Sequence, residues 1–267
     1  MRNIVLTTQY DGTNYIGWQR QPLHRGVSIQ QTLEQALERV LGHEAALWAA
    51  GRTDAGVHAL AQWANFSTTN AIPCQNLAAA LNHILPSDIK ITQAQEVPAA
   101  FHARRSAVEK TYRYLIAREK APLFTRRYLW ELGEELDVAA MKEAVGHLLG
   151  EHDFFAMSSR GSSAQTSVRT IISAQVLELA SLTDLSSEAG LVLPWQQIAG
   201  GLVIEITANG FLYKMMRHIT ARLVEVGRGR EAPSSLAGIL RGEAAAQIDP
   251  APPQGLTLWH IKYESFS

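Results

Sequence analysis

The chain has a single cysteine, Cys74, among 267 residues. One cysteine excludes an intrachain disulfide and a cysteine-rich zinc site, and it is typical of proteins in a reducing cytosol. No apolar run approaches the ~20 residues that a helix needs to cross a bilayer, so no membrane association is expected. The sequence enters a strand-like run directly after Met1-Arg2, so we expect no signal peptide and predict a cytoplasmic location.

An excess of positive charge is also missing. The chain carries 24 Lys and Arg against 25 Asp and Glu, a net charge of −1. Overall charge therefore gives no sign of nucleic-acid binding, and any RNA site must depend on local patches. The candidates are Arg104 with Arg105, Arg126 with Arg127, and the run Lys214, Arg217, Arg222, Arg228 and Arg230, which only Glu225 offsets in the sequence. The alternative is an ordinary solvated surface.

The order of predicted elements indicates two similar halves. In the first half we expect strands at 3–10, 45–50, 60–66 and 88–96 and helices at 29–41 and 76–85. Ser28 is placed as the N-cap of the first helix with Gln31 in capping-box position, and Gly42 as its end. In the second half we expect strands at 111–117, 170–179, 201–208 and 256–264 and helices after Asp137, with Leu149 facing inward, and at 211–226.

Each half reads β-α-β-β-α-β, which predicts an α+β fold. We expect two related, ferredoxin-like halves with largely antiparallel sheets that form a central cleft. The predicted domains are residues 1–105 and 106–267. A polar stretch at 182–197 is interpreted as a long loop or insertion, and the serine-rich stretch at 158–167 as a loop near the site.

The most informative segment is the nonamer 51–59, Gly-Arg-Thr-Asp-Ala-Gly-Val-His-Ala. Asp54 in an isolated Asp-Ala-Gly would most simply be a turn residue that accepts backbone hydrogen bonds. Within the whole nonamer a second interpretation is favoured, because a plain turn does not need Arg52. An aspartate is ionised at neutral pH, an adjacent guanidinium favours that form, and the carboxylate can act as a nucleophile. Arg52 could instead hold a phosphate or a target nucleotide. His58 is assigned no role.

A second group of candidates is Lys110-Thr-Tyr-Arg-Tyr, residues 110–114. In a strand Lys110, Tyr112 and Tyr114 share one face, and Thr111 and Arg113 the other. Tyrosines are common in strands, and a lysine is common at a strand edge, so the pattern has an ordinary explanation. The functional interpretation is a tyrosine platform beneath a base, whose phenol can bond or transfer a proton.

Two further segments carry candidates near the C-terminus. Arg217 falls in the first turns of a predicted helix, where the macrodipole disfavours a cation, so we expect a carboxylate or phosphate partner and favour Asp54. The methionines beside it fit a core stripe. The turn at 252–255 leads into a strand that begins with Leu256, which is either a core residue or a surface that packs against a base.

These segments, with Tyr10-Asp-Gly-Thr and Gly17-Trp-Gln-Arg-Gln near the start, resemble the TruA-type tRNA pseudouridine synthases over nearly the whole chain. The resemblance implies that Asp54 is the catalytic aspartate, Tyr112 the active-site tyrosine, Arg217 the basic partner of the aspartate, and Leu256 an active-site leucine. Lys110, Arg113 and Arg52 are expected to bind substrate. The implied reaction converts uridine to pseudouridine at positions 38, 39 and 40 of the tRNA anticodon stem-loop.

The resemblance further implies a homodimer that binds tRNA, with no cofactor and no metal. Two other classes stay open on the residues alone. A tRNA-binding protein without catalysis would keep its RNA affinity when Asp54 is changed and would form no product. An aspartate-dependent hydrolase of small molecules would show no salt-sensitive RNA binding.

Overall fold

The computed structural model describes residues 1–161, 164–178, 201–243 and 247–264. The chain forms two compact units: Met1–Lys110 together with Thr257–Ser267 is unit 1, and Thr111–Leu256 is unit 2. The units differ from the predicted domains 1–105 and 106–267, because the C-terminal strand joins the first unit. The division into domains itself stays a prediction. None of the described helices is long and apolar enough to span a membrane.

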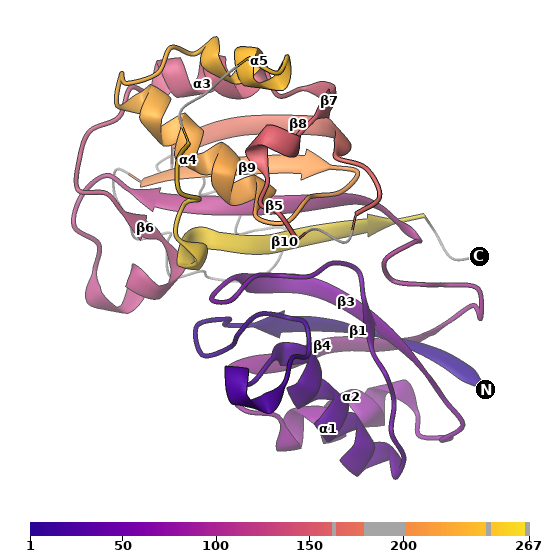
Figure 1. Cartoon of the computed structure of the whole chain (residues 1–267). Coiled ribbons are helices and arrows are strands. Elements are labelled where there is room, and N and C mark those ends of the chain that lie inside the picture. Colours follow the sequence, from indigo (N-terminus) through magenta and orange to yellow (C-terminus); the bar gives the residue numbers. More distant parts are fainter. Residues whose placement is uncertain (162–163, 179–200, 244–246, 265–267) are drawn as a thin grey trace. The chain divides into compact units, whose positions relative to one another are not determined.

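The strands of unit 1 are largely antiparallel, with helices on one face (Figure 1). Its strands run in the order β4-β1-β3, with the short β2 on β3, and all three pairings are antiparallel. The C-terminal strand β10 lies parallel to β3, with Thr257 opposite His58. The elements are β1 (Arg2–Tyr10), α1 (Ile29–Leu41), β2 (Trp48–Ala49), β3 (His58–Thr68), α2 (Cys74–Ile84), β4 (Ile89–Val97) and β10 (Leu256–Tyr263).

The strands of unit 2 run in the order β5-β9-β8-β7, with β6 paired to β5. The β7–β8 and β8–β9 pairings are antiparallel, and β6 lies parallel to β5. Helix α3 packs against both α4 and β8. The elements are β5 (Ala107–Ala117), β6 (Trp130–Glu131), α3 (Val138–Gly146), β7 (Gly150–Asp153), β8 (Val168–Glu178), β9 (Gly201–Ala208), α4 (Met215–Gly227) and α5 (Ser235–Leu240), with 3-10 turns η2 (Leu123–Tyr128), η3 (Phe155–Met157) and η6 (Pro253–Gly255).

The mixed α+β class is therefore confirmed, and so are most predicted elements. Both proposed N-caps form: Ser28 Oγ accepts a hydrogen bond from the Gln31 amide at 3.2 Å, and Asp137 Oδ1 accepts one from the Ala140 amide at 2.9 Å. The reciprocal half of the capping box is wrong. Gln31 Oε1 is buried and has no hydrogen-bond partner among the described residues, so it does not reach back to the cap.

Other corrections concern element ends. The strand expected at 45–50 is only two residues long, and β3 begins at His58, so the nonamer already enters the sheet. Helix α3 ends at Gly146, which leaves Leu149 47% exposed rather than inward. The helix expected from residue 211 begins at Met215, because Lys214 adopts the left-handed region with φ +59°. The stretch 182–197 lies outside the described residues.

The Ser28 cap gives a direct test of the fold. Ser28 is fully buried, and its hydroxyl satisfies an amide that the first turn of α1 leaves without a helical partner. We expect Ser28→Ala to lower the free energy of unfolding by about 1 kcal/mol. Urea unfolding should show this shift, whereas Gln35→Ala, on the exposed side of the same helix, should change the midpoint little. Equal effects of the two substitutions would contradict the cap.

Candidate active site

The part of the nonamer before His58 forms a loop between β2 and β3, in which a buried residue separates two more accessible ones. Thr53 is only 6% exposed, whereas Arg52 is exposed and Asp54 is half-buried. The amide of Val57 donates to the carbonyl of Asp54 at 3.1 Å and closes a tight turn. Buried Thr53 thus lies between an exposed arginine and a partly accessible aspartate.

The segment 10–18 lies directly against this loop. The Trp18 amide donates to the Thr53 carbonyl at 3.0 Å. A Cβ on Gly17, whose φ is +102°, would lie 2.6 Å from the Thr53 carbonyl oxygen and 3.0 Å from the Asp54 carbonyl carbon. A Cβ on Gly12 would lie 2.0 Å from the Val57 oxygen. Both glycines are therefore required by close backbone approach.

His58, which was assigned no role from the sequence, joins the same two segments. Its Nδ1 accepts a hydrogen bond from the Gly12 amide at 3.1 Å and lies 3.2 Å from Asp11 Oδ1. Its side chain is buried. Sequence reasoning missed the segment 10–18 as a support of the loop. The available signal was the pair of motifs at Tyr10 and Gly17, which the family resemblance included without a function.

Lys110 also contacts the loop region. Its Nζ donates to the Ala50 carbonyl at 2.6 Å, one residue before the nonamer. The chain leaves unit 1 immediately after Lys110 and re-enters it at Thr257, whose backbone pairs with His58 at the end of the nonamer. At both points where the chain passes between the units, the residue on the unit 1 side therefore contacts the nonamer or the residue just before it. These residues are Lys110 and Thr257.

In unit 2 the strand that carries Tyr112 is tied to β9. Thr111 Oγ1 and Thr207 Oγ1 are 2.8 Å apart, and Arg113 forms an ion pair with Glu205, which fits the predicted shared face of Thr111 and Arg113. Tyr112 is 7% exposed, and its ring meets that of Phe211 edge-to-face, with centroids 4.8 Å apart and planes at 74°. That geometry is favourable for an aromatic pair.

Arg217 lies in the first turn of α4 and is buried. Its Nε donates to the Ala251 carbonyl at 2.6 Å, and the Ala251 amide donates to the Arg217 carbonyl at 3.0 Å. These bonds tie the helix start to the chain that leads to Leu256, which is 5% exposed. The predicted pairing of Arg217 with Asp54 stays a prediction.

Tyr114 supports the same turn from the strand side. Its hydroxyl donates to the Pro252 carbonyl at 2.7 Å, and burial raises the pKa of Tyr114, so it stays a donor at neutral pH. A Cβ on Gly255 would lie 2.6 Å from the Tyr114 ring. Tyr114 and Arg217 thus fix the backbone immediately before Leu256.

His218 follows Arg217 and contacts the serine-rich loop. Its Nε2 lies 2.9 Å from Ser159 Oγ. Burial, and then the positive charges of Arg217, Lys214 and Arg222, lower the pKa of His218. The imidazole is therefore neutral at pH 7, and at least one residue of the loop predicted near the site does contact α4.

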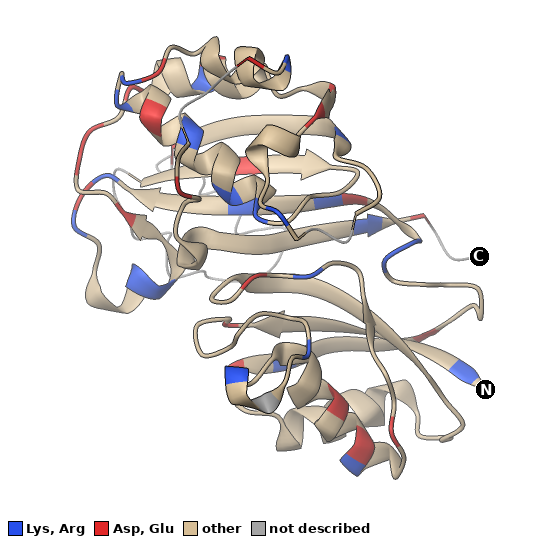
Figure 2. Cartoon of the chain, viewed as in Figure 1, with Lys and Arg blue, Asp and Glu red and all other residues tan. Residues whose placement is uncertain are grey.

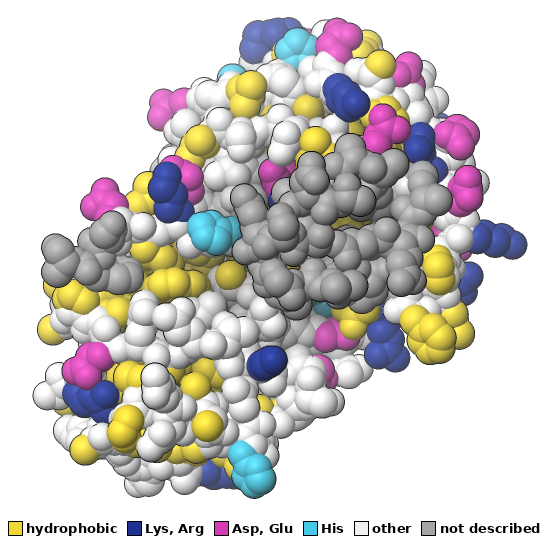
Figure 3. Space-filling model, turned by 180° about the vertical axis from the view of Figure 1, so that it is seen from behind, with side chains coloured by type: hydrophobic (Ala, Val, Ile, Leu, Met, Phe, Trp, Pro, Cys, Tyr) yellow, Lys and Arg dark blue, Asp and Glu magenta, His cyan; other side chains and the backbone are white. Residues whose placement is uncertain are grey.

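The basic run around α4 is not an open cationic patch, contrary to its appearance in the sequence. Arg222 pairs with Glu231, and Arg228 with both Glu134 and Glu225. Acidic residues thus lie beside basic ones along α4 and the segment after it (Figure 2), and the face drawn in Figure 3 likewise intersperses the two signs. Glu134 and Glu231 lie outside the basic run, so the run by itself did not indicate that its arginines are paired. Arg104, Arg105, Arg126 and Arg127 are exposed.

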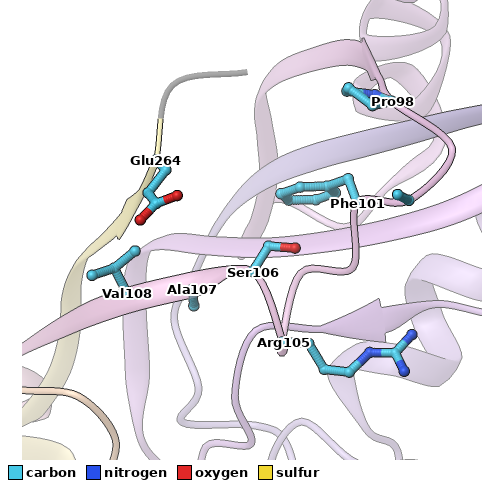
Figure 4. A pocket seen from close by; sticks show the side chains of 8 residues that line it. Pro98, Phe101, Arg105, Ser106, Ala107, Val108 and Glu264 are labelled. Atoms are coloured by element: carbon cyan, nitrogen blue, oxygen red, sulfur yellow. The ribbon is translucent and has the colours of Figure 1, made fainter. Parts of the chain in front are cut away.

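A surface hollow of unit 1 involves other residues. It is lined by the linker before β5 and by the end of β10, with Phe101, Arg105, Val108 and Glu264 around it (Figure 4). No residue of the nonamer lines it. The hollow is therefore a feature separate from the Asp54 loop.

Comparison with known proteins identifies the family. A family model described as tRNA pseudouridine synthase matches residues 6–104 and 144–264. The chain is 42% identical to tRNA pseudouridine synthase A 2 of Clostridium perfringens, over 98% of this chain and 100% of that relative. It is 41% identical to tRNA pseudouridine synthase A of Thermoanaerobacter sp. and 40% identical to that of Caldicellulosiruptor bescii, with the same coverage.

An α+β protein with an aspartate loop held between strands is thus placed among the RNA-modifying isomerases. The chain belongs to the tRNA pseudouridine synthase family. The predicted resemblance and the predicted enzyme class are confirmed. The roles of individual residues stay predictions.

Gly17→Ala should damage the loop specifically. The added methyl group overlaps the Thr53 carbonyl, so the loop must move, and we expect a fall of about 100-fold in the rate of tRNA modification. Gly42→Ala is the matched control, because Gly42 also has positive φ but no atom within 4 Å of its Cβ position. Gly42→Ala should lose stability and keep its rate. Equal rates in the two variants would contradict the close approach.

His218 should make stability depend on pH in one direction. Since its pKa is lowered by folding, the unfolded chain binds the proton first as the pH falls through about 6.5. The wild type should therefore lose stability between pH 7.5 and 5.5, and His218→Gln should lose less. His24→Gln, at an exposed position, is the control. Thermal unfolding at the two pH values measures this, and an unchanged pH dependence in His218→Gln would refute it.

Proposed function

We propose that the chain converts uridine to pseudouridine at positions 38, 39 and 40 of the tRNA anticodon stem-loop, with Asp54 as the essential catalyst. The family relationship supports the reaction. The observation that carries the residue assignment is the loop itself, in which buried Thr53 lies between exposed Arg52 and half-buried Asp54. A partly accessible carboxylate on a loop held by backbone hydrogen bonds is suited to a substrate that approaches from solvent.

The proposed chemistry is an isomerisation. The N1–C1′ bond of uridine breaks, the C5–C1′ bond forms, the proton on C5 is lost, and N1 gains one. Atoms and electrons balance without an oxidant, ATP or a metal ion. Asp54 would attack C6 of the ring or C1′ of the ribose, or promote glycal formation, and these routes stay open.

Tyr112, Arg217 and Leu256 are proposed to act on the same nucleotide. Tyr112 follows Lys110 by two residues and Leu256 precedes Thr257 by one, so short covalent stretches connect both to contacts of the Asp54 region. Tyr112 would stack on the base or move a ribose proton, and Leu256 would pack against the base. Arg217 is proposed as the basic partner of Asp54.

Arg52, Lys110 and Arg113 are proposed to bind the substrate. Exposed Arg52 is free to reach an RNA phosphate or the target nucleotide, whereas Lys110 and Arg113 already bond to Ala50 and Glu205. These contacts within the protein already give Lys110 and Arg113 a structural role. Any contact with substrate would be in addition to that role.

Other parts of the proposal concern assembly and architecture. The target base must leave its stem, at a cost of a few kcal/mol of stacking and pairing. We infer a homodimer in the cytoplasm that binds tRNA through both subunits. We also infer two ferredoxin-like halves, supported by the β4-β1-β3-β2 antiparallel order of unit 1.

Asp54→Asn should abolish turnover and leave tRNA affinity intact, because the amide keeps the shape and loses the charge. Pseudouridine is isobaric with uridine, so carbodiimide labelling with primer-extension stops should map it in an unmodified transcript. Asp153→Asn, at the exposed end of β7, should retain the wild-type rate.

The outcomes separate the alternatives. Near-wild-type turnover by Asp54→Asn would remove the catalytic assignment. A wild type that binds tRNA but gives no stops would favour a binding protein. Absence of salt-sensitive tRNA binding would favour a small-molecule hydrolase.

Tyr112→Phe separates stacking from proton transfer. Phenylalanine keeps the edge-to-face contact with Phe211, so the fold and tRNA affinity should be unchanged. We expect kcat to fall by about 100-fold or more, the size of a lost proton transfer. Single-turnover kinetics would measure it. An unchanged rate would leave Tyr112 with stacking alone, and Tyr112→Leu should then still lose activity.

A further inference from the structure

Thr53, in the loop, is held in the core by a tyrosine from β1. The hydroxyl of Tyr10, at the end of β1, lies 2.8 Å from Thr53 Oγ1, and both side chains are less than 7% exposed. Burial raises the pKa of Tyr10, so the phenol remains protonated and can hydrogen-bond at any physiological pH. Breaking a buried hydrogen bond of this kind costs free energy, because the remaining polar group then has no hydrogen-bond partner, not even water.

Gln62 extends the same network to the start of the nonamer. Its Nε2 donates to the Gly51 carbonyl at 2.7 Å and lies 3.5 Å from the Tyr10 hydroxyl, at the limit of hydrogen-bond length. Gln62 is fully buried, and its Oε1 has no hydrogen-bond partner among the described residues. The hydrogen bond from Gln62 Nε2 to the Gly51 carbonyl therefore determines how the side-chain amide of Gln62 is oriented.

The anchored residues immediately precede Arg52 and Asp54. Gly51 and Thr53 alternate with Arg52 and Asp54, so fixing the first two fixes the direction of the last two. The rings of Tyr10 and Trp18 are also near each other, with centroids 6.1 Å apart, and the Trp18 amide holds the Thr53 carbonyl. The Thr53 side chain and carbonyl are thus held by separate groups.

We propose that Tyr10 is a positioning residue of the enzyme, which orients Asp54 by holding Thr53, with Gln62 as its support at Gly51. The inference rests on the proposed catalytic role of Asp54. Neither Tyr10 nor Gln62 needs to touch RNA. A carboxylate displaced by about 1 Å loses up to 100-fold in rate, whereas binding of a large RNA depends little on it.

The test is a double-mutant cycle on the Tyr10–Thr53 bond. Tyr10→Phe and Thr53→Val each remove one partner and keep the shape. Each should lower kcat by about 10- to 100-fold with KM within about twofold of wild type. The double variant should lose no more than either single one, because both remove the same bond. Tyr263→Phe is the matched control: its hydroxyl donates to the Ala103 carbonyl at 2.8 Å in the same unit, away from the loop.

Tyr263→Phe should lower thermal stability much as Tyr10→Phe does and keep the wild-type kcat. Three results would overturn the inference: a wild-type kcat in Tyr10→Phe, an equal fall in Tyr263→Phe, or losses that multiply in the double variant. Hydrogen exchange of residues 50–58 gives an independent readout. It should become faster in Tyr10→Phe and not in Tyr263→Phe, and unchanged exchange would also contradict the inference.

These measurements keep the two proposals apart. If the wild type forms no pseudouridine, the proposed function fails, and hydrogen exchange still decides whether Tyr10 holds the loop. If the wild type is active and Tyr10→Phe is equally active, the function stands and the positioning role is refuted.

Discussion

The close backbone approach between segment 10–18 and the Asp54 loop determines what the loop can do. Gly17 lies so near the Thr53 carbonyl and the Asp54 backbone that no side chain fits between them. The loop has little room to relax in that direction, so Arg52 and half-buried Asp54 are supported by closely packed backbone. Such packing holds a reactive group in place before substrate arrives, so less reorganisation is needed during the reaction.

The unit 2 candidates are supported in a similar way, by bonds to backbone carbonyls. Arg217 donates to Ala251 and Tyr114 to Pro252, so one side chain from α4 and one from β5 fix the turn before Leu256. Arg217 is therefore needed for local structure whether or not it also pairs with a carboxylate. Substitution of Arg217 alone would not separate these two roles.

The sequence predicted most helices and strands because apolar periodicity and caps are local signals. Ser28, Asp137 and Gly42 mark helix ends that the structure confirms. The start of α4 was predicted wrongly because it depends on the left-handed backbone conformation of Lys214. The residue type at that position does not predict this conformation. The nonamer was recognisable, but the partners of Asp54's loop come from β1 and the segment after it, and contacts between distant segments leave no periodic pattern. For the same reason Glu134 and Glu231 could not be foreseen as partners of the basic run.

The most direct test of the account is a crystal structure of the protein bound to an unmodified anticodon stem-loop RNA. The account predicts one uridine from positions 38 to 40 turned out of its stem, with its ring and C1′ against the Asp54 carboxylate and the loop unchanged from its position in the free protein. A target uridine bound away from Asp54, or an Asp54 loop that has left Thr53's buried position, would contradict it.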